Sequence, residues 1–354
     1  MSEDPVAATE AVRPYPPSWL DRLTAWVDRL PLPALAFYAL AGVVAVVLFI
    51  LNEAVNGLGL VDATRPFHFV LAIGPIYAVA LVHFLDHEAG RALEKIKPLL
   101  TCDETGYAAL RYQLTTIPAR GALWAGLAGM SAGLAAVGIG RVAMPRAFAS
   151  FILPGAGRAF IEIWLAGTWF IFGGLFVHTI HQLRLISRIY TNDTRIDLDQ
   201  YRPLFNFSRV SALTAMGLLL LPYGWYATVP GLIQEPIGIV FGGLFPVFAV
   251  IAFVAPLVGV HHLLVDAKED ALVENARALK IARAELYHRA IAHELTAASA
   301  VHDMLAALRS ERTALEHLHT WPWQSETLRS LIAVLVLPLV LWFIQWLLGR
   351  LLAP

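Results

Sequence analysis

Residues 317–354 read HLHTWPWQSETLRSLIAVLVLPLVLWFIQWLLGRLLAP, a segment that is largely polar up to Ser330, apart from Trp321, Pro322 and Trp323, and almost entirely apolar from Leu331. Proline does not continue a helix behind it, and tryptophan favours the headgroup level of a membrane. About 20 consecutive apolar residues cross a bilayer as a helix. The stretch therefore predicts a corner at which the chain returns to the membrane, followed by a membrane span at about 328–348.

The rest of the chain has the composition of a membrane protein. Hydrophobic residues make up 58% of it and charged residues only 15%, whereas a soluble domain carries about 25% charge. Six earlier apolar runs predict six more spans, at 32–52, 67–85, 121–140, 159–180, 208–229 and 237–261. We therefore expect an all-α membrane protein with seven transmembrane helices.

The distribution of lysine and arginine predicts the orientation of these spans, because both residues favour cytoplasmic loops. With the N-terminus placed in the cytoplasm, the outer segments hold only a few of the 26 lysines and arginines, namely Arg65, Arg141, Arg146, Arg158 and Arg350. This asymmetry predicts a cytoplasmic N-terminus and an outer C-terminus.

The spans divide the chain into four parts. Residues 1–31 form a cytosolic N-terminal segment, and residues 32–261 a six-span domain with two cytosolic helical loops at 86–120 and 181–207. Residues 262–320 form a cytosolic stalk, and residues 321–354 the corner and the seventh span. The N-terminal segment is expected to contain a short amphipathic helix on the membrane surface, formed around Trp19, Leu20, Leu23, Trp26 and Val27.

The predicted stalk is helical because no glycine or proline, the strongest helix breakers, occurs between Val260 and Trp321. Apolar residues repeat there at heptad-like intervals typical of a coiled coil; they are Leu272, Leu279, Leu286, Val301, Leu305, Leu308 and Leu315. The chain must return to the membrane, so we expect a helical hairpin that reverses near LTAASA (295–300). The leucines could face each other within one chain or between subunits.

Three stretches carry a resemblance to a known group of proteins: DTRIDLDQYRPLFNFSRVSALTA (193–215), PLVGVHHLLVDAKEDAL (256–272) and TWPWQSETLRSLIAVLVLPLVLWFIQ (320–345). They resemble a group of uncharacterised prokaryotic multi-span membrane proteins. The resemblance implies an integral protein of a prokaryotic inner or plasma membrane, and it implies no activity.

The predicted architecture also resembles the seven-span ligand-gated ion channels of the insect odorant and gustatory receptors. These share the N-in, C-out direction and a cytosolic helix that leads into the last span. The resemblance implies a homo-oligomer, with a tetramer favoured, in which the seventh span lines the pore. The family's motif there is Thr-Tyr, five apolar residues and Gln-Phe. Here Pro338 and Leu339 differ from its first half, while Gln345 and Trp346 match its second half loosely.

Gln345 is the one strongly polar side chain of the seventh predicted span, so it should face protein or water. It could form a hydrogen bond between helices or line a pore. Pro338 would kink the same helix and free backbone carbonyls. The candidate pore-lining residues are Gln345, Pro338, Leu341 and Trp342.

Histidines cluster at the predicted inner ends of the even-numbered spans. Spacings of three or four place two imidazoles on one helix face, as a metal ion requires. If these helix ends converge, His83, Asp86, His87, His178, His181, His261 and His262 could bind zinc or iron. The same residues could instead be interfacial histidines, with Asp86 as a partner. Any other cofactor is unknown.

Four acidic residues lie at the predicted outer ends of the spans: Glu53, Asp62, Glu162 and Glu235. They could ring an outer vestibule that favours cations. They could equally form ion pairs with the outer arginines.

The sequence favours a channel or channel-like receptor for an unknown small ligand or ion. The alternatives are a membrane metalloenzyme that uses the inner histidines, a transporter, and a non-conducting sensor or scaffold. We expect no enzyme of a familiar kind, because no Walker loop, GxSxG or CxxC motif occurs. The net charge of −1 and the absence of a long basic run give no reason to expect nucleic acid as a partner.

Overall fold

The computed structural model describes residues 13–57, 66–143, 155–194, 198, 202–228, 236–292, 295–323 and 325–352. Within these ranges the chain is helical and contains no β-sheet. The helices are α2 Trp19–Asp28, α3 Ala34–Val55, α5 Pro66–Ile96, α6 Glu104–Leu114, α7 Ala119–Ala143, α8 Gly155–Asn192, α9 Asn206–Thr228, α10 Pro236–Ile291, α11 Leu295–Glu316 and α12 Ser325–Leu352, with 3-10 turns η1 Lys97–Leu99 and η3 Arg202–Phe205.

Six of these helices are long and apolar enough to cross a membrane: α3, α5, α7, α8, α9 and α10. Helices α5, α7, α8 and α10 contain one predicted span each, and α3 and α9 cover all but one or two residues of the spans predicted at 32–52 and 208–229. The seventh predicted span, 328–348, falls within α12. The side chains of residues 338, 339 and 341–352 of that helix lie outside the described part of the structure. A membrane crossing by α12 therefore remains a prediction, as do the direction of the spans and their number.

Several membrane helices continue past the predicted ends of their spans. Helix α5 runs on to Ile96 and α8 to Asn192, so the predicted loops 86–120 and 181–207 begin as extensions of membrane helices. Falling hydrophobicity marks where a span ends, whereas a breaking residue marks where a helix ends. No glycine or proline follows Gly174 in α8, and α5 ends two residues before Pro98.

Helices α7 and α8 approach each other closely through glycine. A Cβ atom added to Gly129 would lie 2.6 Å from the carbonyl oxygen of Trp169, and one added to Gly133 would overlap the Trp169 ring. On the facing helix, a Cβ atom at Gly173 would overlap the backbone of Ala125. This close packing agrees with the GxxxG spacing of α7.

The predicted amphipathic helix is present as α2. Its first turn is closed by a capping box, in which the Ser18 hydroxyl accepts from the Asp21 N–H and the Asp21 carboxylate accepts from the Ser18 N–H. Leu20 and Val27 are fully buried, and the Trp19 ring packs beside Gly174 of α8. One face of α2 therefore packs against the helix bundle.

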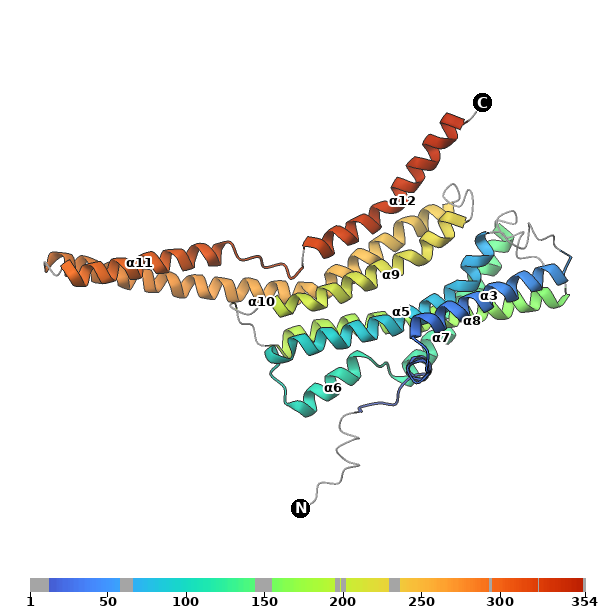
Figure 1. Ribbon diagram of the computed structural model, residues 1–354, viewed down its shortest axis with the longest axis horizontal. Coiled ribbons are helices and arrows are strands. Elements are labelled where there is room, and N and C mark those ends of the chain that lie inside the picture. Colours follow the sequence, from blue (N-terminus) through green and yellow to red (C-terminus); the bar gives the residue numbers. More distant parts are fainter. Residues whose placement is uncertain are drawn as a thin grey trace, which may run out of the picture.

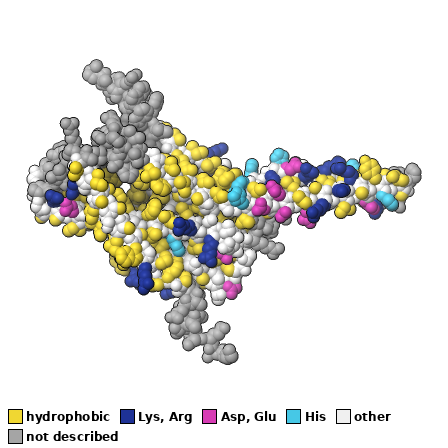
Figure 2. Space-filling model, turned by 180° about the vertical axis from the view of Figure 1, so that it is seen from behind, with side chains coloured by type: hydrophobic (Ala, Val, Ile, Leu, Met, Phe, Trp, Pro, Cys, Tyr) yellow, Lys and Arg dark blue, Asp and Glu magenta, His cyan; other side chains and the backbone are white. Residues whose placement is uncertain are grey.

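The stalk consists of the distal part of α10 and the antiparallel α11, and it projects well beyond the other helices (Figure 1). Leucines of the two helices pack on each other within one chain, with Leu279 and Leu305 buried and Leu286 and Leu308 beside them. Helix α11 already begins at Leu295, so the reversal precedes LTAASA. Charged and hydrophobic side chains are mixed on the visible face of the stalk, whereas hydrophobic ones predominate on the body of the molecule (Figure 2).

Candidate functional site

A histidine–carboxylate cluster lies where α2, α3 and α5 meet. His83 Nε2 is 2.9 Å from Asp28 Oδ1, and His87 Nε2 is 3.9 Å from the same oxygen. The Tyr38 hydroxyl is 3.0 Å from His83 Nδ1. His83 and His87 are one turn apart on α5, so their rings share a helix face. Asp28, at the last position of α2, faces them from outside the membrane helices.

Asp86 lies three residues after His83 but belongs to a different, buried pair. Its carboxylate accepts a hydrogen bond from His178 Nε2 at 2.8 Å and one from the Gln182 amide at 3.2 Å. His178 and Gln182 are one turn apart on α8. The Gln182 amide also reaches the backbone carbonyl of Leu114 at 3.3 Å. This pair therefore joins α5 to α8 and to the segment before α7.

The N-terminal segment completes the polar region. The Tyr15 hydroxyl donates to the backbone carbonyl of Thr116 at 2.8 Å and lies 3.3 Å from His181 Nε2. Burial raises the pKa of Tyr15 well above its ordinary value, so this hydroxyl remains a donor at physiological pH. Asp21 Oδ2 accepts from the Ile117 N–H at 3.2 Å. The residues before α3 are thus tied to the start of α7.

Several buried polar atoms in this region have no hydrogen-bond partner among the described residues. They are Asp21 Oδ1, His178 Nδ1, Thr179 Oγ1 and Gln182 Oε1. An unpaired buried polar atom costs about 1–3 kcal/mol, and a bridging polar molecule such as water offsets that cost.

The remaining predicted histidines lie elsewhere. His261 stacks on the Trp321 ring, with ring centroids 4.0 Å apart, and its Nδ1 is 3.3 Å from the carbonyl oxygen of Thr320. His262 neighbours His261. The seven predicted metal ligands thus separate into His83 with His87, Asp86 with His178, His181 beside Tyr15, and His261 with His262. Within the described residues one group of three side chains has metal-ligand spacing: Asp28, His83 and His87.

Sequence reasoning missed Asp28, Tyr38, Tyr15, Asp21 and Gln182. Each contacts a residue far away in the chain; Asp28 and His83, for example, are 55 positions apart. Helical spacing reports only on residues within one helix, so no pattern in the sequence could pair them. Of these residues, only Asp21 could have been predicted from the sequence, because it follows Ser18 at the spacing of a capping box.

The candidate vestibule acids that the structure describes, Glu53 and Glu162, lie against basic side chains. Glu162 lies 2.9 Å from Arg158 and 3.2 Å from Arg141. Glu53 and His68 form a buried pair at 2.7 Å. Asp62 and Glu235 lie outside the described residues, as do the side chains of the four pore candidates, Pro338, Leu341, Trp342 and Gln345.

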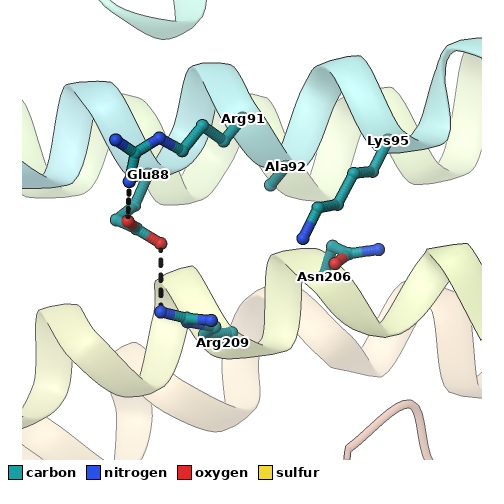
Figure 3. Close-up of a pocket in the computed structure, with 6 residues that line it drawn as sticks. All are labelled: Glu88, Arg91, Ala92, Lys95, Asn206 and Arg209. Carbon is teal, nitrogen blue, oxygen red and sulfur yellow. Dashed lines mark hydrogen bonds and ion pairs between the residues drawn. The ribbon is translucent and has the colours of Figure 1, made fainter.

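A basic pocket of about 170 Å³ lies between α5 and α9. Figure 3 shows Arg91 and Arg209 approaching Glu88 from the two helices, while Lys95 extends toward Asn206. Glu88 is 2.7 Å from Arg91 and 3.5 Å from Arg209. The pocket is lined by three cationic side chains and one carboxylate. The resulting net positive charge beside the first turn of α9 suits an anionic group such as a lipid phosphate.

Comparisons with family models, with curated proteins and with solved structures find no match for this chain.

Proposed function

We propose that the protein is a homo-oligomeric channel or channel-like receptor, assembled through its stalk, with α12 of each subunit around a central path. In this arrangement the stalk lies in the cytoplasm and the ligand or ion is small. The proposal rests most heavily on the apolar surface of the stalk, because lipid cannot cover a segment that projects so far beyond the bundle (Figure 1).

The exposed apolar residues of the stalk fall largely on one side of α10. Val273, Ile281, Tyr287 and Ile291 are 50%, 71%, 68% and 78% exposed. At 3.6 residues per turn they occupy an arc of about 120°. Leu279 and Leu286, which pack on α11, lie on the opposite side. Arg277 and Lys280 are exposed within the same arc, so this side of α10 is a mixed face of apolar and cationic side chains. We take it as the proposed subunit interface.

The position of α12 supports a path surrounded by several subunits. Its first half packs against α9, where Leu331 is buried, whereas its second half diverges from α9 and α10 (Figure 1). Ile332, Val336 and Val340 are 49%, 42% and 46% exposed. A helix that diverges from its own bundle in this way can pack against the same helix of neighbouring subunits.

Ion flux into liposomes tests the conducting role. Full-length protein should carry a flux that changes in rate or ion selectivity when Gln345→Leu removes the polar group of α12, because a pore-lining group contacts the permeating ion. Val43→Ala, a 60% exposed position on α3, is the matched control and should conduct like the parent. Absence of flux with every ion and ligand, from protein shown to be oligomeric, would reject conduction and leave a scaffold.

A further inference from the structure

Asp28, His83 and His87 have the donor set of a transition-metal site. Two imidazoles and one carboxylate bind zinc and iron in many proteins, with one or more positions left open. Metal–ligand bonds of about 2.0–2.2 Å in a tetrahedral site place donor atoms roughly 3.3 Å apart. The observed separations of 2.9 and 3.9 Å lie on either side of that value, and the donor atoms are all within 4.8 Å of one another.

The second nitrogen of each imidazole is already hydrogen-bonded. His87 Nδ1 lies 3.0 Å from the backbone carbonyl of His83. A carbonyl only accepts, so Nδ1 carries the proton and Nε2 presents its lone pair toward Asp28. His83 Nδ1 faces the Tyr38 hydroxyl at 3.0 Å, and donation to that oxygen would free His83 Nε2 in the same way. Metal-binding histidines usually have such a second partner.

The cluster is open on one side and closed on the other. The side chains of His87 and Asp28 are 51% and 48% exposed, whereas that of His83 is 6% exposed. An ion could thus reach the site from the solvent, while Tyr38 and the helix packing hold His83 in place. A simple salt bridge needs one histidine and one carboxylate, whereas here two histidines approach the same oxygen, Asp28 Oδ1.

We propose that Asp28, His83 and His87 bind one divalent transition-metal ion of the Zn²⁺ class, with Tyr38 orienting His83. The bound ion would fasten the C-terminal end of α2 to α5. Asp86, which the sequence grouped with these histidines, takes no part because its carboxylate pairs with His178.

Cobalt titration of chelator-treated full-length protein in detergent tests the proposal, because Co²⁺ bound by nitrogen and oxygen ligands in a low-coordinate site absorbs in the visible range. We expect saturation at one Co²⁺ per chain and displacement by Zn²⁺. His87→Ala, a half-exposed position whose replacement spares the core, should abolish the bands. Tyr38→Phe should weaken binding about 10-fold, the lower limit for loss of a second partner.

His288→Ala, which removes an exposed stalk histidine, is the matched control and should bind like the parent. Binding that persists in His87→Ala, or the absence of saturable binding in the parent, would overturn the proposal. The titration reports on each chain in any oligomeric state. A metal-free tetramer would therefore reject the metal site alone, and a metal-binding monomer would reject the proposed assembly alone.

Discussion

The carboxyl group of Asp86 is held by two side chains of α8 in the interior of the bundle. His178 and Asp86 are 1% and 8% exposed, so neither has water to replace a lost partner. A buried polar pair of this kind contributes little over an apolar pair of the same size, but losing one member leaves the other unpaired. We therefore read the pair as the element that fixes the register between α5 and α8.

Replacement of His178 by alanine should destabilise the protein strongly. Removal of one partner of a buried pair costs about 3–5 kcal/mol, which should appear as a large drop in the Tm of the detergent-solubilised protein. His262→Ala, at an exposed position, should change the Tm little. Asp86→Ala added to His178→Ala should cost much less than the sum of the single changes. Equal Tm values for His178→Ala and His262→Ala would contradict this role.

At the scale of single residues, the sequence indicated which histidines matter but could not identify the residues that they contact. His83, Asp86 and His87 fall within five residues, and their spacing suggested one shared site. On the helix they face different neighbours, because Asp86 turns toward α8 while His83 and His87 turn toward α2 and α3. The partners that separate them come from distant parts of the chain.

At the scale of elements, the tightest packing of the bundle joins α7 and α8, and it depends on small residues. Gly126, Gly129 and Gly133 of α7 face residues 169–173 of α8. Such close contact gains dispersion energy that a larger side chain would prevent. The seam should therefore be sensitive to a single methyl group at the contact and insensitive to one away from it.

Gly133→Ala and Gly138→Ala make a matched pair that tests this seam. A Cβ atom at Gly133 would overlap the Trp169 ring, whereas one at Gly138 meets nothing within 4 Å. Overpacking costs about 1–3 kcal/mol, so Gly133→Ala should lower the Tm. Gly138→Ala should leave it unchanged or raise it, because alanine favours helix more than glycine. The reverse order would show that the seam is loosely packed.

The sequence predicted these elements more reliably than their ends. Long apolar runs mark six helices that the structure contains, and the absence of breakers between Val260 and Trp321 marks the stalk. Helical segments were expected in the cytosolic loops 86–120 and 181–207, but their continuity with the membrane helices, which carries α5 to Ile96 and α8 to Asn192, was not predicted. A helix needs only unbroken hydrogen bonding, and it remains helical after it leaves the apolar layer.

At the scale of the whole molecule, two of the exposed apolar surfaces bear on assembly: one side of the stalk and the outward side of α12. The periodicity of the stalk leucines could not reveal the exposed face of the stalk. It predicted one packed face and did not decide whether that face packs within one chain or between subunits. Leu279 and Leu305 face each other within the chain, and the exposed apolar residues then form a second face. A second copy of the chain is the proposed occupant.

A native mass spectrum of the detergent-purified full-length protein tests that assembly most directly, with Ile281→Glu and Ala290→Glu measured beside the parent. The account predicts a mass of four chains for the parent and for Ala290→Glu. The exposed Ala290 lies outside the arc of α10 that holds Val273, Ile281, Tyr287 and Ile291. Ile281→Glu should shift the population to single chains, because a buried unpaired carboxylate opposes association. A parent spectrum of single chains, or a tetramer that survives Ile281→Glu, would contradict assembly through the stalk.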